Sequence, residues 1–179
     1  KGVLWGYSEP LITPGRMTVA SLLKNNGYHT AIVGKWHLGM TMSTVDGKAL
    51  PVGRRPNRLN IDWNGPIKNG PCDFGFDYFY GISASLDMAP YIYIENDRFI
   101  GDLPPQDGKS FVAKGFDHSD VLPEIGRKTA EYIRKQKGDK PFFVYVPLTS
   151  PHTPIVPTSE WIGKSGLNKH ADFQMQTDH

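Results

Sequence analysis

The segment Tyr28-His-Thr-Ala-Ile-Val33 leads directly into Gly34-Lys-Trp-His-Leu-Gly39. Its first half is a short run rich in β-branched residues, which is typical of a strand. Its second half is flanked by glycines and carries Lys35 and His37, as a polar turn would. Ligands of open α/β sheets bind outside the carboxyl ends of the strands. The segment therefore predicts a strand and, directly after it, a candidate ligand site.

The residues around this segment suggest further elements. Apolar periodicity predicts a short helix over residues 16–26, with Gly27 placed to cap its end. The aromatic run 74–82 indicates a second strand or a turn packed on the core. Alternation over 91–94 and again near 98–100 predicts a hairpin with Asn96-Asp97 at its turn.

The second half of the chain repeats the order helix, strand, polar loop. A helix is expected from Ser119 or Asp120 to about Gln136, followed by a strand over 141–146. That strand is almost continuously apolar, which predicts burial on both of its faces. Residues 40–73 carry few periodic signals and are expected to form a long surface excursion. Helices alternating with strands predict the α/β fold class.

Composition limits the classes of function. The 179 residues are 39% hydrophobic and 21% charged, and the net charge is only +2. This balance argues against a nucleic-acid binder that depends on phosphate contacts. A single cysteine excludes an internal disulfide framework and a cysteine-based zinc site. No apolar stretch approaches the ~18 residues of a membrane span, and no signal peptide opens the chain. Both ends of the chain suggest an internal piece of a larger protein.

Two loops after the strongest strands are the best candidates for chemistry. Lys35 and His37 follow one strand at i and i+2 spacing, and His152 follows the other. If the two strands are neighbours, a lysine and two histidines converge on one crevice. Such a set suits an oxyanion, because lysine supplies fixed charge and histidine transfers protons near pH 7. Two simpler interpretations remain open: a surface turn around a packed Trp36, and a proline-flanked turn shaped around His152.

Other polar residues give weaker signals. A thiol without a paired base favours an inert role for Cys72. Ser85 lacks the Gly-x-Ser-x-Gly context of a nucleophile. Three arginines more often form a solvated loop than an anion contact: Arg54, Arg55 and Arg58. Several carboxylates lack the spacing of an EF-hand, so surface and turn roles are favoured over calcium binding: Asp73, Asp77, Asp87, Glu95 and Asp97.

Three stretches resemble a known family, and together they cover essentially the whole chain. Gly27-Tyr-His-Thr-Ala-Ile-Val-Gly-Lys-Trp-His-Leu-Gly39 resembles the second signature of the type I, arylsulfatase-like sulfatases. Residues 75–87 are similar to the family's segment that ends in an active-site serine. Residues 141–146, with Ser150-Pro-His-Thr-Pro154, resemble the strand and loop that carry its active-site histidine.

The resemblance implies a fold and a reaction. The fold is part of an alkaline-phosphatase-like three-layer α/β/α sandwich with a mixed, mostly parallel sheet. The reaction is hydrolysis of sulfate esters with a Ca2+ ion and a formylglycine nucleophile. Lys35 resembles the lysine that binds the sulfate group and the formylglycine hydrate. His37 resembles the histidine that supports this hydrate and helps to eliminate sulfate. Ser85 matches the pocket serine, and His152 resembles a general acid near the ester oxygen.

The chain also departs from the family pattern. It contains no Cys/Ser-x-Pro/Ala-x-Arg motif, and it lacks the paired aspartates, the downstream Asp-Asn metal pair and a second sulfate-binding lysine. Residues 1–179 are therefore expected to be a partial sulfatase catalytic domain that is inactive alone. Its metal ligands would lie in the remainder of the sulfatase polypeptide.

The resemblance also bears on substrate and location. It implies a sulfated small molecule or glycan as substrate and a periplasmic or extracellular location. Two alternatives remain: a phosphonate monoester hydrolase or phosphodiesterase of the same superfamily, and a non-catalytic anion- or glycan-binding remnant.

Overall fold

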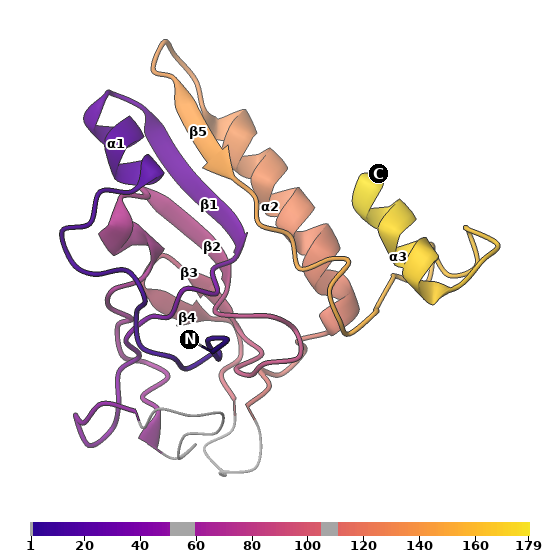
Figure 1. The fold of residues 1–179 in the computed structure, drawn as a ribbon, viewed down its shortest axis with the longest axis horizontal. Coiled ribbons are helices and arrows are strands. Elements are labelled where there is room, and N and C mark those ends of the chain that lie inside the picture. Colours follow the sequence, from indigo (N-terminus) through magenta and orange to yellow (C-terminus); the bar gives the residue numbers. More distant parts are fainter. Residues whose placement is uncertain (1, 51–59, 105–110) are drawn as a thin grey trace.

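Five strands form one sheet in the computed structural model, which describes residues 2–50, 60–104 and 111–179 (Figure 1). The strands are β1 (His29–Lys35), β2 (Tyr78–Ile82), β3 (Tyr93–Glu95), β4 (Arg98–Ile100) and β5 (Phe142–Tyr145). The helices are α1 (Val19–Asn25), α2 (Val121–Lys135) and α3 (Lys169–Asp178), with short 3-10 helices η2 (Pro71–Phe74) and η3 (His118–Asp120).

The sheet is mixed, as predicted. Its order is β4-β3-β2-β1-β5. Strand β1 pairs in parallel with both β2 and β5, whereas β3 pairs antiparallel with β2 and β4. The predicted hairpin is β3–β4, and Asn96 at its turn has a φ of 54°. The two strands that precede the candidate polar loops, β1 and β5, are therefore neighbours.

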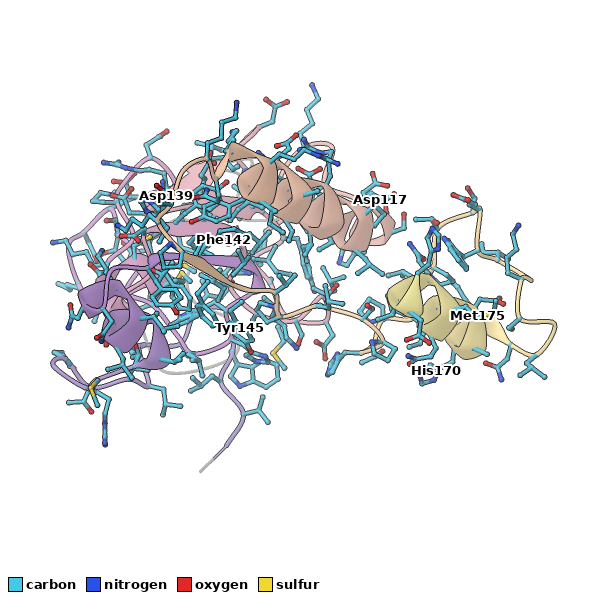
Figure 2. All side chains as sticks on the ribbon, turned by 90° about the horizontal axis from the view of Figure 1, so that it is seen from above. Asp117, Asp139, Phe142, Tyr145, His170 and Met175 are labelled. Carbon is cyan, nitrogen blue, oxygen red and sulfur yellow. The ribbon has the colours of Figure 1, made fainter. Side chains whose placement is uncertain are left out.

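The helices α1 and α2 lie on opposite sides of the sheet (Figure 2). On the α1 side, Ala20 of the helix belongs to a core cluster with Ile32 and Phe79. On the α2 side, Val121 and Ile125 are fully buried in a second cluster with strand residues. Because side chains alternate along a strand, one short β1 supplies both layers.

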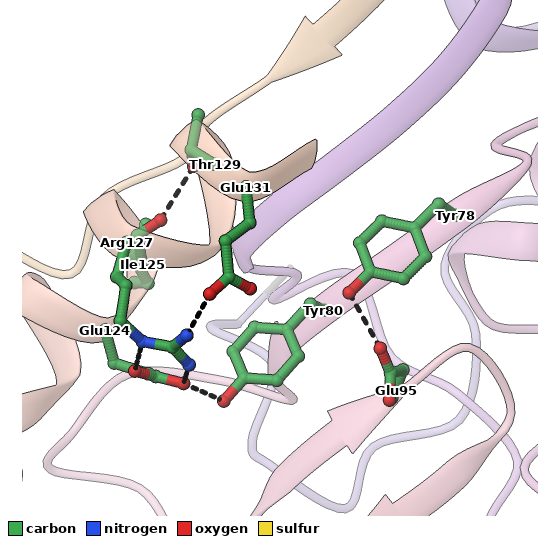
Figure 3. A network of polar contacts seen from close by, with 8 residues as sticks. All are labelled: Tyr78, Tyr80, Glu95, Glu124, Ile125, Arg127, Thr129 and Glu131. Atoms are coloured by element: carbon green, nitrogen blue, oxygen red, sulfur yellow. Dashed lines mark hydrogen bonds and ion pairs between the residues drawn. The ribbon is translucent and has the colours of Figure 1, made fainter. Parts of the chain in front are cut away.

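A polar network fastens α2 to the sheet (Figure 3). The Tyr80 hydroxyl donates to Glu124 at 2.8 Å, and the Arg127 guanidinium donates to the same carboxylate. Arg127 holds the pKa of Glu124 below its usual value. On the same face of β2, the Tyr78 hydroxyl donates to Glu95 of β3 at 2.8 Å. The Tyr80–Glu124 bond thus ties α2 to β2, and the Tyr78–Glu95 bond ties β2 to β3.

The helix before β1 begins later than the sequence suggests. It was expected over 16–26, but α1 begins at Val19 because Thr18 caps it by accepting from the Ser21 amide at 3.0 Å. The Thr18 hydroxyl also donates to the Phe74 carbonyl at 2.6 Å. The end of the helix agrees with the prediction, since Gly27 follows the C-cap with a φ of 86°.

Two expectations about exposure are wrong. Residues 40–73 do not form a surface excursion where the structure describes them. They contribute buried side chains to the α1-side core without regular strands: Met40, Met42, Leu50, Ile61, Trp63 and Ile67. Strand β5 is not buried on both faces either. It lies at the edge of the described sheet, with Phe142 41% and Tyr145 50% exposed.

Two glycines give a paired test of this packing. A Cβ at Gly81 would lie 1.7 Å from the Gly34 carbonyl oxygen, whereas a Cβ at Gly126 in α2 would meet nothing within 4 Å. We expect Gly81→Ala to lower the free energy of unfolding by about 3 kcal/mol, because backbone must move. Gly126→Ala should raise it by about 1 kcal/mol, because alanine favours a helix interior. Urea denaturation of both variants measures this, and equal effects would contradict the packing.

Candidate functional site

The carboxyl ends of β1, β2 and β5 meet at one edge of the sheet. Backbone hydrogen bonds continue beyond the strands. The Lys35 amide donates to the Pro147 carbonyl at 2.8 Å, and the His37 amide donates to the Ser83 carbonyl at 2.9 Å. Gly34 permits the close approach to the β5 side, because a Cβ there would lie 2.2 Å from the Pro147 carbonyl oxygen. The loops that follow all three strands are thus held together.

Lys35 and Ser85 form the central contact of this edge. Lys35 is the last residue of β1, and its Nζ donates to Ser85 Oγ at 3.2 Å. Ser85 is 2% exposed. Among the described residues, no carboxylate lies within ion-pair distance of Lys35 Nζ, and Ser85 is its one side-chain partner. An ammonium has three donors, so this group keeps capacity for an anion.

The environment of Lys35 disfavours its charge. Burial lowers the pKa of the Lys35 ammonium, and the nearby Asp87 carboxylate offsets part of this shift. A bound anion would restore the favourable interactions that burial removes. The site therefore gains from taking up a negatively charged ligand.

His37 is held by the N-terminal segment. Its φ is 56°, and its Nε2 lies 2.9 Å from the Leu4 carbonyl oxygen. Because a carbonyl only accepts, Nε2 carries the proton, and Nδ1 is left without a hydrogen bond to the described residues. The neighbouring Trp36 is buried, donates from Nε1 to the Gly39 carbonyl at 2.7 Å and stacks on Phe74. A packed tryptophan thus anchors the turn, as one interpretation of the sequence held.

His152 lies in the loop after β5 and is exposed. Its Nδ1 lies 2.7 Å from the Thr153 carbonyl oxygen, so Nδ1 donates and Nε2 faces no described partner. No hydrogen bond joins Lys35, His37 and His152 within the described parts of the chain. The structure therefore brings Lys35 and Ser85 into contact and places the two histidines on loops at the same edge.

The sequence did not reveal two buried hydroxyls at this edge. Ser83 and Thr149 are each 3% exposed, and their hydroxyl oxygens have no hydrogen-bond partner among the described residues. Ser83 directly follows β2 and Thr149 lies in the loop after β5, so the strand-end rule that selected Lys35 could also have found them. Buried polar groups in folded proteins are almost always paired, so these two hydroxyls are candidate contacts for a ligand or for another segment.

Cys72 lies away from this edge of the sheet. Cys72 is in η2, before the amino end of β2, whereas Lys35 is at the carboxyl end of the parallel β1. Burial raises the pKa of the Cys72 thiol to about 11, which fits the inert role expected. Residues 51–59, which include the three arginines, lie outside the described residues. The described residues contain no group of three or more His, Cys, Asp or Glu side chains that could hold a metal ion.

The family model for sulfatases matches residues 4–179. The chain belongs to the sulfatase family. It is 29% identical to an N-acetylgalactosamine-6-O-sulfatase from Bacteroides thetaiotaomicron, over 99% of this chain and 40% of that protein. It is 23% identical to the human N-acetylgalactosamine-6-sulfatase, over 93% of this chain and 28% of that protein.

Solved structures agree with this assignment. A structure from a study of glycosaminoglycan metabolism by Bacteroides thetaiotaomicron superposes with a TM-score of 0.77 and 28% identity. It covers 99% of this chain and 42% of that one. The PsFucS1 sulfatase from Pseudoalteromonas sp. shares the fold, with a TM-score of 0.60, 18% identity, and coverage of 95% of this chain and 36% of that one. These matches confirm the alkaline-phosphatase-like α/β fold.

The sulfatase chain spans about 40% of the length of the Bacteroides relative. In the described part of the chain, no helix is both long and apolar enough to cross a membrane.

The lowered pKa of Lys35 predicts how anion binding depends on pH. Inorganic sulfate should stabilise the chain while Lys35 is charged. As the pH rises, this stabilisation should already weaken before pH 10.5, the ordinary lysine pKa, is reached. The measurement is the sulfate-induced rise in Tm at increasing pH, taken as the difference between wild type and Lys35→Met. A difference that stays undiminished up to pH 10.5 would contradict the lowered pKa of this ammonium.

Proposed function

We propose that this chain forms part of the active site of an enzyme that hydrolyses sulfate esters of sulfated sugars. One observation carries the proposal. In a member of the sulfatase family, a half-buried lysine with no carboxylate partner among the described residues donates to a buried serine at the carboxyl edge of the sheet. Fixed donors of this kind stabilise the charge that develops on a sulfuryl group in transfer. We assign binding of the sulfate group to Lys35 and Ser85.

The two histidines supply proton transfer in this proposal. His152 is exposed, with Nδ1 already donating to a backbone carbonyl, so its Nε2 is available to protonate a leaving oxygen. We assign it the role of general acid at the ester oxygen. His37 is held rigidly through Nε2, and we assign its Nδ1 the second proton transfer of the site.

The family also implies Ca2+ and a formylglycine nucleophile. The described residues offer no ligand group for a metal, and the only cysteine, Cys72, lies at the opposite end of β1 and β2 from Lys35. This chain's described residues therefore do not fit either group. We propose that residues 1–179 are a partial catalytic domain and that the remaining polypeptide provides both groups.

The substrate class follows from the relatives. The Bacteroides and human proteins are named as sulfatases of N-acetylgalactosamine, which favours a sulfated glycan sugar. We further propose export to the periplasm or the extracellular space, where such glycans occur. A phosphate or phosphonate ester is the alternative substrate, and the assay below includes one.

Replacement of Lys35 tests the assignment. In the complete polypeptide, we expect Lys35→Ala to lower sulfate ester turnover by about 100- to 1,000-fold, because the developing negative charge loses a fixed cation. Lys164→Ala, on an exposed lysine far along the chain, is the matched control and should leave turnover near wild type. Initial rates on paired sulfate and phosphate esters provide the measurement. Near-normal rates in Lys35→Ala, or faster phosphate than sulfate hydrolysis by wild type, would refute the proposal.

The 179-residue chain alone should not hydrolyse sulfate esters. It has no Cys/Ser-x-Pro/Ala-x-Arg motif for the nucleophile. Release of inorganic sulfate from N-acetylgalactosamine 6-sulfate, with and without added Ca2+, is the assay. Turnover that depends on the metal would show that this chain carries the whole machinery and would overturn the partial-domain assignment.

A further inference from the structure

Asp87 is an unexpected neighbour for an anion-binding lysine. It lies two residues after Ser85, in a turn closed by a hydrogen bond from the Met88 amide to the Ser85 carbonyl at 2.9 Å. Its side chain is exposed, and within the described residues no hydrogen bond or ion pair engages it. Its charge nevertheless acts on the Lys35 ammonium. A carboxylate here repels a sulfate group held by Lys35, so it weakens binding of the anion itself.

The turn that carries Asp87 is held firmly. Gly6 of the N-terminal segment packs so tightly against it that a Cβ there would lie 2.0 Å from the Ala89 carbonyl oxygen. Further along, the Tyr91 amide donates to Phe111, and the Ala113 amide donates back to Tyr91, both at 2.9 Å. Asp87 is thus displayed from a fixed segment, and fixed polar groups are the kind that determine ligand orientation.

The aromatic residue Tyr91 lies four residues after Asp87 on the same segment, within range of its charge. Burial raises the pKa of the Tyr91 phenol, and the charge of Asp87 adds to the rise. The Tyr91 ring is half-buried and packs against His118, with ring centroids 4.6 Å apart. The carboxylate and the braced aromatic ring are therefore carried by one short stretch of chain that begins directly after Ser85.

We propose that Asp87 and Tyr91 form the sugar-binding side of the site, where the carboxylate accepts hydrogen bonds from neutral hydroxyl or amide N–H groups and the tyrosine ring packs against the sugar. This inference rests on the proposed function. It also explains why a negative charge lies near an anion site. Asp87 repels the sulfate group, so a substrate binds well only if its sugar offers hydroxyl or N–H donors to this carboxylate. A site built for such donors rejects substrates that lack them. An aryl sulfate without such donors, such as 4-nitrophenyl sulfate, is disfavoured.

A comparison of two substrates, a sugar sulfate and an aryl sulfate, tests this selectivity. We call opposite changes in their kcat/KM values a crossover. In the complete polypeptide, Asp87→Asn should lower kcat/KM for N-acetylgalactosamine 6-sulfate by about tenfold to a hundredfold, mainly through KM, because an amide replaces a charged acceptor. For 4-nitrophenyl sulfate, kcat/KM should instead rise about twofold, because the repulsion is removed. Asp87→Glu should recover part of the sugar activity. Asp139→Asn, at an exposed aspartate between α2 and β5, is the matched control.

The outcomes separate this inference from the proposed function. A crossover in Asp87→Asn, with both activities lost in Lys35→Ala, supports both assignments. Equal losses on both substrates in a folded Asp87→Asn variant, judged by an unchanged Tm, would overturn the role of Asp87 and leave the sulfatase site standing. Normal hydrolysis of both substrates by Lys35→Ala would overturn the proposed function instead. If Asp87→Asn is unfolded, Tyr91→Leu replaces it: a rise in KM confined to the sugar supports the inference, and an unchanged KM contradicts it.

Discussion

The rest of the structure depends on the close parallel pairing of β1 with both of its neighbours. Gly34 and Gly81 have no side chains where the two backbones come nearest, and Gly34 also lies against the Pro147 carbonyl after β5. Backbone hydrogen bonds then continue past the strand ends. Three carboxyl ends are thereby held at one edge of the sheet, and every polar residue assigned to the site follows one of them.

The charged form of Lys35 is destabilised at this edge of the sheet. Lys35 is half-buried, and burial lowers its pKa, yet no ion pair compensates it among the described residues. Two buried hydroxyls, on Ser83 and Thr149, also lack partners in the part of the chain that the structure describes. Natural proteins tolerate such features mainly at functional sites, where a ligand or another segment supplies the missing interactions. Asp87 is explained in the same way. Its charge repels the anion, so the site favours substrates that carry hydrogen-bond donors next to the sulfate group.

Much of this could be predicted from the sequence because the signals were local. The β-branched run before Lys35, the glycine after the first helix and the Asn96 turn each follow from short-range rules, and family resemblance supplied Ser85 and His152. The features that were predicted wrongly, the burial of β5 and the exposure of residues 40–73, depend on tertiary contacts. Whether the apolar strand β5 is central or at an edge depends on its neighbours, and the irregular segment with Ile61 and Trp63 is buried by packing rather than by periodicity. The Leu4 contact that orients His37 spans 33 residues, and no local pattern signals it.

In the proposed site, Lys35 and Ser85 hold a sulfate group at the carboxyl edge of β1. A crystal structure of the complete polypeptide soaked with inorganic sulfate tests it most directly. The account predicts a sulfate oxygen within hydrogen-bond distance of both Lys35 Nζ and Ser85 Oγ, with His152 on the leaving-group side. A Lys35 ammonium paired with a carboxylate, and sulfate bound only elsewhere, would contradict it.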